Sequence, residues 1–231
     1  MPWASRPAFR IFDILPAIML DRGELVRRLR SVPANAPSLR AERKRISKDA
    51  ATLDRHAVLA LAHHLIDAHI PRFVAYELLL NHEPAIQSIT QSEVEKLGKG
   101  IGHWGDVDSF ACFIAGPAWR TGRIPDSTIR AWARSDDWCW RRAALVSTVP
   151  LNSRAQGGAG DSKRTMTICG MLVTDRHDLV VKGLSWALRE LAKRDPESVR
   201  LFLSAHRDKL AARVIREVNN KLATGRKNPR Q

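Results

Sequence analysis

The chain has 231 residues, of which 44% are hydrophobic and 27% charged, a balance that excludes a wholly disordered protein. Its 38 Lys and Arg outnumber 24 Asp and Glu, so the formal net charge is +14. The three cysteines, Cys112, Cys139 and Cys169, lie far apart in apolar helical patterns and offer neither a disulfide framework nor a thiolate metal site. We expect them to be core residues of a cytoplasmic protein that has no metal and no cofactor.

The positive charge indicates a polyanion as the partner. Lys and Arg recur along the whole chain instead of gathering on one helix that could lie on lipid, so nucleic acid is favoured over a membrane surface. A basic surface that serves only solubility is the alternative.

The first twenty residues stand apart from the periodic chain that follows them. The segment FRIFDILPAIML (9–20) is as apolar as a signal-peptide core, but Asp13 and Pro16 interrupt it and no small-residue cleavage site follows. The expected division of the chain is an N-terminal arm (1–20), one repeat domain (21–224) and a basic tail (225–231).

From Asp21 onward, apolar residues recur at helical spacing, without the alternating runs that are typical of strands. Asp126, Asp161 and Asp195 are suited to start helices. Pro71 and Pro196 fall where the first turn of a helix tolerates proline. We predict an all-α fold, with helices over 53–69, 71–82, 91–101, 126–136, 165–173 and 199–210.

A repeat becomes visible when DDWCWRRAAL (136–145) is laid over HDLVVKGLSW (177–186), because Asp137 then falls on Asp178 at an offset of 41 residues. This offset is typical of HEAT repeats, which are helical pairs of roughly 40–47 residues. The segment HIPRFVAYELL (69–79) is interpreted as a degenerate earlier copy. We therefore predict a HEAT-like solenoid whose concave face forms a basic groove suited to duplex DNA.

The clearest irregular segment is VPLNSRAQGGAGDSKR (149–164). Its three glycines oppose helix formation and follow no phosphate-loop pattern. We expect a mobile basic loop between two repeats, with its charge supplied by Arg154, Lys163 and Arg164.

Five of the seven tryptophans fall within residues 104–140. Trp119 and Trp132 lie in apolar helical patterns, so we predict that they are core residues. Trp104 stands at the entry to a helix, where a side chain can face a groove, and Trp186 precedes polar residues that suit the concave side.

Asp106 and Asp108 open the segment DVDSFACFIAG (106–116). The simplest interpretation is a helix N-cap and a first-turn carboxylate, worth about 1 kcal/mol. A functional carboxylate is the alternative. Four histidines crowd one segment without a matching pattern of carboxylates or cysteines, so surface or packing roles are expected for His56, His63, His64 and His69.

Three segments resemble, in order and spacing, the signature segments of the AlkD-type DNA alkylation-repair glycosylases, a HEAT-like repeat family. They are HWGDVDSF (103–110), SDDWCWRRAAL (135–145) and VVKGLSWALREL (180–191). The resemblance extends over approximately residues 25–224 and is strongest from 100 to 200. It implies a concave face lined by Trp104, Asp108, Arg142 and Trp186.

The same resemblance implies a DNA glycosylase that excises positively charged alkylated purines, such as 3-methyladenine or 7-methylguanine, in base excision repair. Asp108 would stabilise the oxocarbenium-like sugar. Trp104 and Trp186 would stack on the sugar or on the cationic base, and Arg142 would hold the phosphate beside the lesion. The other cations expected to follow the DNA backbone are Arg40, Arg43, Arg45, Arg141, Lys163, Arg164, Lys182, Arg189, Arg213 and Arg216.

We expect a monomer that acts on double-stranded DNA and makes no membrane contact. Two other functions fit the sequence. A non-catalytic DNA-binding or damage-recognition protein predicts the same basic groove but no rate loss when Asp108 is removed. A helical adaptor for an acidic protein predicts tight protein binding and little salt-dependent affinity for DNA.

Overall fold

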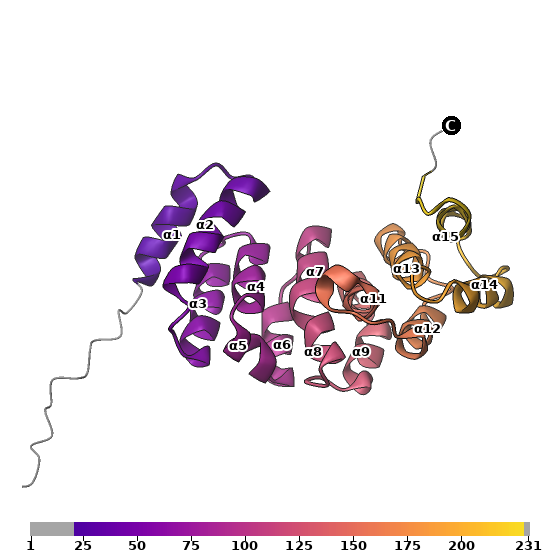
Figure 1. Ribbon diagram of the computed structural model, residues 1–231, viewed down its shortest axis with the longest axis horizontal. Helices are drawn as coiled ribbons and strands as arrows, with labels where there is room; N and C mark the ends of the chain where they lie inside the picture. The colour runs from indigo at the N-terminus through magenta and orange to yellow at the C-terminus, as the bar shows by residue number, and fades with distance from the viewer. Residues whose placement is uncertain (1–20, 229–231) are drawn as a thin grey trace, which may run out of the picture.

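The computed structural model describes residues 21–228, and every regular element in that range is a helix (Figure 1). The all-α prediction is confirmed. The N-terminal arm expected over 1–20 lies outside the described residues, as do the last three residues of the basic tail.

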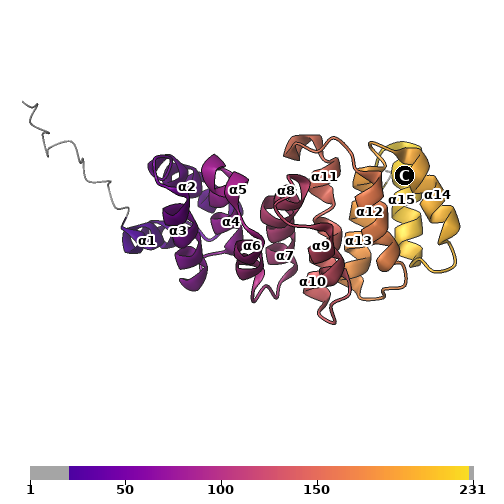
Figure 2. The same cartoon turned by 90° about the horizontal axis from the view of Figure 1, so that it is seen from below.

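The helices follow one another in chain order along the length of the molecule (Figure 2), and they form two rows, one above the other in Figure 1. In the inner row each helix contacts the next. Its members are α2 (Ala36–Asp49), α4 (Arg72–Leu80), α7 (Trp104–Phe110), α10 (Trp138–Val146), α13 (Asp178–Leu191) and α15 (Ala212–Thr224). Figure 1 shows the array bending so that α2 and α15 rise at its two ends.

The outer row lies on the other side of the core. Its members are α1 (Arg22–Ser31), α3 (Arg55–Asp67), α5 (Glu83–Ser88), α6 (Gln91–Gly98), α8 (Gly116–Arg120), α9 (Asp126–Ala133), α12 (Ser162–Met171) and α14 (Pro196–Ala205). All six helices predicted from the apolar periodicity are present, as α3, α4, α6, α9, α12 and α14, with ends that differ by a few residues. Helical pairs stacked in this way are the solenoid that the repeat predicted.

Local hydrogen bonds define where most of the helices start. Asp161 accepts a bond from the Arg164 amide and Asp195 from the Ser198 amide, so both are the N-caps that the sequence predicted. Asp126 is not a cap. It is the first helical residue of α9, behind Pro125, and its carboxylate accepts a hydrogen bond from the Trp119 indole at 2.8 Å. The Asp126 carboxylate therefore makes a tertiary contact, which the sequence pattern around it does not predict.

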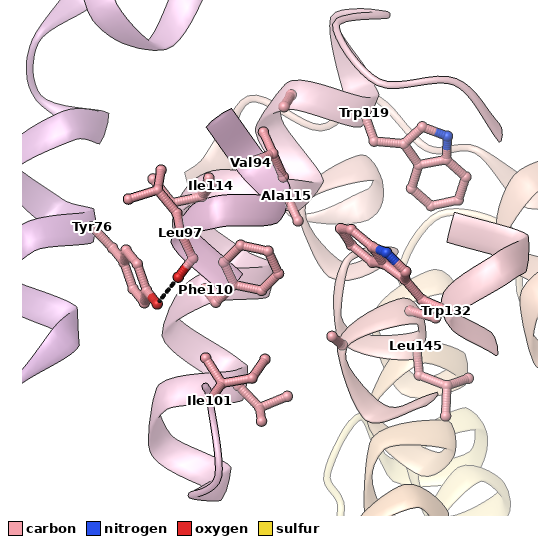
Figure 3. Close-up of a cluster of buried hydrophobic side chains, with 14 of the residues drawn as sticks. Tyr76, Val94, Leu97, Ile101, Phe110, Ile114, Ala115, Trp119, Trp132 and Leu145 are labelled. Atoms are coloured by element: carbon pink, nitrogen blue, oxygen red, sulfur yellow. Dashed lines mark hydrogen bonds between the residues drawn. The ribbon is translucent and has the colours of Figure 1, made fainter. Parts of the chain in front are cut away.

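Aromatic side chains fill the core between the rows (Figure 3). Trp119 is 1% exposed and Trp132 8%, which confirms both as core residues. Tyr76 is fully buried and donates to the Leu97 carbonyl at 2.8 Å; burial raises its pKa to about 12. Phe110 packs against Trp132, with ring centroids 5.7 Å apart. Packing of Phe110 in this core fixes the position of α7.

The three cysteines are buried, as expected. Burial raises the pKa of the Cys112 thiol to about 12 and that of Cys139 to about 11, and it also raises the pKa of Cys169. None of them is a reactive thiolate at neutral pH.

The prediction of an irregular loop over 149–164 is contradicted over much of the segment. The segment forms a short helix, α11 (Val149–Asn152), then a 3₁₀ turn over Arg154–Gln156, before α12 begins. Asn152 is buried and organises it, because its amide donates to the Thr148 carbonyl and its oxygen accepts from the Asp161 amide, each at 2.9 Å.

Close approach of backbone explains one of the glycines in this segment. A Cβ at Gly158 would lie 2.4 Å from the Pro150 carbonyl oxygen, closer than any side chain tolerates. Arg194 then fastens the turn by donating to the carbonyls of Asn152 and Gly158, each at 2.8 Å. Gly158 therefore allows the backbone of this segment to pack closely.

The repeat is confirmed as a structural relationship, with a shift of register. α10 and α13 are neighbours in the inner row, but their N-cap residues are Asp137 and His177. The helices therefore correspond at an offset one residue shorter than the sequence alignment of Asp137 with Asp178.

Two kinds of feature are absent from residues 21–228. No helix there combines the length and apolar character needed to cross a bilayer. No group of three or more His, Cys, Asp or Glu side chains there is arranged to hold a metal ion.

Candidate functional site

An open pocket of about 440 Å³ lies on the inner row, at the point where α7, α10 and α13 meet. The described residues that line it come from these three helices and from the segment after α15. They are Trp104, Asp108, Arg142, Leu179, Lys182, Trp186, Arg189 and Lys227. All four residues that the resemblance places on the concave face are among them.

Asp108 and Arg142 form a bidentate ion pair in this pocket. The Arg142 Nε and Nη2 atoms each donate to one carboxylate oxygen of Asp108, both at 2.8 Å. The Nη1 atom donates to the Leu179 carbonyl. Arg142 therefore ties three inner helices together, and it is only 5% exposed. The Asp108 side chain is 17% exposed, so the carboxylate retains access to the pocket.

The start of α7 places Asp108 at this point. The N-cap is His103, whose Nδ1 accepts from the Gly105 amide at 3.1 Å. The N-cap interpretation of Asp106 and Asp108 is therefore wrong, because the helix begins at Trp104. Asp106 lies in the first turn, and Asp108 lies one turn further along, where its side chain is free to pair with Arg142.

A π-helical turn over Ala111–Ala115 follows α7 directly. Pro117 comes just after it and, lacking an N–H, removes the next α-helical hydrogen bond. Turns of this kind are frequent at functional sites because they widen a helix locally. Here the turn contributes Ala111 and Cys112 to a small apolar cluster beside the pocket.

The two tryptophans of the pocket differ in exposure. Trp104 is 52% exposed, an unusual state for so large an apolar side chain, and packs only loosely against His103 with ring centroids 5.2 Å apart. Trp186 is half-buried and packs on the cluster formed by Ala111, Cys112, Val146 and Val149. The Trp104 indole is thus open to solvent, while the Trp186 indole is packed against apolar side chains.

A second polar network borders the pocket on the α15 side. Glu217 is 4% exposed and accepts from the Ser185 hydroxyl at 2.6 Å. The Arg189 Nε lies 4.0 Å from the same carboxylate, and the Lys227 Nζ 3.4 Å. Burial lowers the pKa of Arg189, although the group stays cationic. Two cations thus share one carboxylate.

Sequence reasoning missed Leu179, Glu217 and Lys227. Leu179 contributes only a backbone carbonyl, for which no sequence signal exists. Glu217 lies in an ordinary amphipathic helix, and Lys227 lies in a short tail where no recognised motif indicates that the chain turns back.

The other predicted DNA-binding cations are divided between two regions. Lys182 lines the pocket and pairs with Asp178 at 2.7 Å, and Arg213 reaches the same carboxylate at 3.6 Å. Arg189 is in the pocket as well, and Arg216 is exposed on α15. This half of the prediction is consistent with one basic region around α13 and α15.

The remaining predicted cations are not among the residues that line the pocket. Arg141 donates to Asp175 at 2.7 Å, and Arg164 donates to Asp161 while lying over the Trp119 ring. Lys163 is exposed beside Arg164 on the outer row.

Ion pairs between neighbouring helices recur along the inner row. Glu77 on α4 is 6% exposed and binds Arg40 at 2.7 Å and Arg43 at 3.1 Å, both from α2. Arg45 binds the buried Glu42 of its own helix at 2.9 Å. The Asp108–Arg142 pair has this same architecture. Its position at an open pocket beside an exposed indole distinguishes it.

Comparisons with known proteins place the chain in a family and show a related fold. The model of the DNA alkylation repair enzyme family matches residues 32–222. No protein of curated function is a significant match. The solved structure of a "predicted DNA alkylation repair enzyme" from Enterococcus faecalis superimposes with a TM-score of 0.66 at 16% identity, covering 88% of this chain and 95% of that one. That identity shows the fold alone, but the family match spans well over half of the sequence, and the protein belongs to the DNA alkylation repair enzyme family.

Proposed function

We propose that the protein is a DNA glycosylase that excises positively charged alkylated purines, of the 3-methyladenine or 7-methylguanine type, from duplex DNA. The observation that carries the proposal is the carboxylate of Asp108, held rigidly in an open pocket beside the exposed Trp104 indole. The net charge of +14 and the family membership favour DNA as the substrate.

Hydrolysis breaks the bond between C1′ of deoxyribose and the purine nitrogen. The electron pair leaves with the base and neutralises its positive charge, while positive charge develops on the sugar. Water then adds to C1′ and loses its proton to the carboxylate or to solvent. A cationic base leaves without a general acid, and Asp108 is the one carboxylate among the described residues that line the pocket.

Asp108 is suited to stabilise the charge that grows on the sugar. An ionised carboxylate offers about four lone-pair directions, and Arg142 uses one on each oxygen. The remaining directions can accept a bond from the attacking water or face C1′. Because Arg142 fixes the carboxylate, little reorganisation is needed as the reaction proceeds.

The tryptophans supply binding surface for the nucleoside. Trp104 is exposed enough to lie on the deoxyribose or on the cationic ring, a contact worth about 1–2 kcal/mol once water is excluded. Trp186 is backed by the apolar cluster and limits how deeply the backbone enters. An open pocket of this kind suits engagement of the duplex backbone better than complete enclosure of a flipped base.

The structure modifies the role assigned to Arg142. Three of its five N–H donors are already used and it is 5% exposed, so we assign it chiefly to positioning Asp108. Lys182 and Arg189 also line the pocket and are more exposed than Arg142, with side chains 41% and 19% accessible, and we assign the phosphates beside the lesion to them.

A DNA-binding protein without catalytic activity is the second candidate. The recurrence of buried ion pairs along the inner row favours it, because Asp108 and Arg142 then need serve only to join α7 to α10. This candidate predicts salt-dependent DNA binding and no release of base.

The test compares two duplexes of the same sequence, one carrying 7-methylguanine and the other hypoxanthine, a neutral purine lesion. The protein is used in excess, and released base is measured by chromatography. The proposal predicts release of 7-methylguanine and negligible release of hypoxanthine. No release from either duplex would support the binding-only candidate, and equal release from both would show that the pocket supplies a general acid.

A further inference from the structure

Lys227 lies beyond the segment that the family model matches, which ends at residue 222, yet it lines the pocket together with Trp104 and Asp108. The residues concerned, 225–228, follow α15 and are called the C-terminal hook below. The hook was expected from sequence only to be part of a basic tail. Its position makes it a component of the site.

The hook is specified by a set of local hydrogen bonds. Gly225 adopts a left-handed conformation with φ of 73°, and its amide donates to the Lys221 carbonyl at 2.9 Å, which ends α15 and reverses the chain. The side-chain amide of Asn220 then donates to the Lys227 carbonyl at 3.1 Å. The Arg226 amide donates to the Thr224 hydroxyl at 3.2 Å. The chain after α15 therefore turns back toward the pocket.

The charge of Lys227 is only partly compensated. Its Nζ lies 3.4 Å from Glu217, which is buried and already accepts a hydrogen bond from Ser185. The same carboxylate also faces Arg189. Because one carboxylate serves two cations, the network retains a net positive charge. The Lys227 side chain is 42% exposed, and an ammonium has three donors, so it can contact an anion in the pocket while staying near Glu217.

We propose that Lys227 binds a phosphate of the DNA that occupies the pocket, so that the C-terminal hook forms one wall of the substrate site. The proposal rests on the proposed function for the identity of the polyanion. It adds a contact outside the family-matched segment, on the side opposite α7. Lys227 and Arg189 together then hold the backbone next to the sugar that faces Asp108.

A structural role for Lys227 is the rival explanation, since it could serve only to neutralise Glu217. The two roles differ in their response to a second substitution. If Lys227 only compensates Glu217, replacing Glu217 by glutamine removes the need for it. If Lys227 binds phosphate, the loss of DNA affinity persists when Glu217 is neutral.

The experiment measures affinity for an undamaged duplex as a function of salt, with the full chain and the variants Lys227→Met, Arg226→Met, and Lys227→Met combined with Glu217→Gln. Arg226 is the matched control, because it is exposed, carries the same charge, is adjacent in sequence, and is not among the pocket-lining residues. Thermal melting checks that each variant is folded.

We expect Lys227→Met to bind more weakly at low salt and to reduce the slope of log K against log salt by about 1, because one phosphate contact is lost. Arg226→Met should leave the slope near that of the wild type, and Glu217→Gln should not restore it. A slope for Lys227→Met equal to that of Arg226→Met, or full rescue by Glu217→Gln, would overturn the proposal. Undamaged DNA keeps this result separate from the proposed chemistry, which fails only if base release is absent.

Discussion

Replacing Arg142 by alanine should destabilise the protein more than any other single change in the pocket. The side chain is 5% exposed and makes two hydrogen bonds of 2.8 Å to Asp108 and a third to the Leu179 carbonyl. Its removal leaves the Asp108 carboxylate, 17% exposed, without a cation. Removing one partner of a buried ion pair lowers the free energy of unfolding by about 3–5 kcal/mol. We expect a loss of about 3 kcal/mol here because Asp108 keeps some contact with water. At about 2–4 °C per kcal/mol, Tm should fall by roughly 10 °C.

A double-mutant cycle with Asp108→Ala separates the ion pair from the other contacts. Urea denaturation of the two single variants and of Arg142→Ala/Asp108→Ala gives their free energies of unfolding. We expect the double variant to be more stable than the sum of the single losses predicts, by about 1–3 kcal/mol, because no uncompensated charge remains. Additivity within about 0.5 kcal/mol would refute the reasoning, since it would mean that the two side chains do not interact.

Two other substitutions test the pocket and the segment that supports it. Trp104→Ala should leave Tm unchanged, because the indole is 52% exposed, but lower the efficiency of 7-methylguanine release by about 5–30-fold through lost stacking; a clear drop in Tm would show instead that the indole is a core residue. Gly158→Ala should lower stability by more than about 1 kcal/mol, because its Cβ would meet the Pro150 carbonyl oxygen at 2.4 Å; a calorimetric Tm equal to that of the wild type would contradict the close approach.

Much of the fold is predictable because its determinants are local. Apolar periodicity identified the helices, and Asp161 and Asp195 cap helices through amides three residues away. Two of the failures concern carboxylates that have tertiary partners. Asp126 and Asp108 were suited by sequence to a helix start, but tertiary partners, the Trp119 indole and Arg142, take their carboxylates. A local pattern cannot name a partner 34 residues away.

The site shows the same division. The exposed Trp104 was predicted from its place at a helix entry, while the assembly with Arg142 and Trp186 followed only from the resemblance. Which cations would face the pocket could not be predicted, because Arg164 is as basic as Lys182 but lies over Trp119 on the outer row. The position of Lys227 was not predicted. It depends on the left-handed conformation of Gly225, which ends α15 and directs the tail, and no motif marks this glycine.

The central claim is that the Asp108 carboxylate stabilises charge on the sugar in the transition state, and single-turnover release of 7-methylguanine by Asp108→Asn tests it most directly. Glu77→Gln is the matched control, because it also removes a buried carboxylate that binds arginine from a neighbouring inner helix. With folding of both variants verified by melting, we predict a rate about 10²–10³ lower for Asp108→Asn, near-normal DNA affinity, and a wild-type rate for Glu77→Gln. A folded Asp108→Asn protein that released base at the wild-type rate would show that the acid only joins α7 to α10.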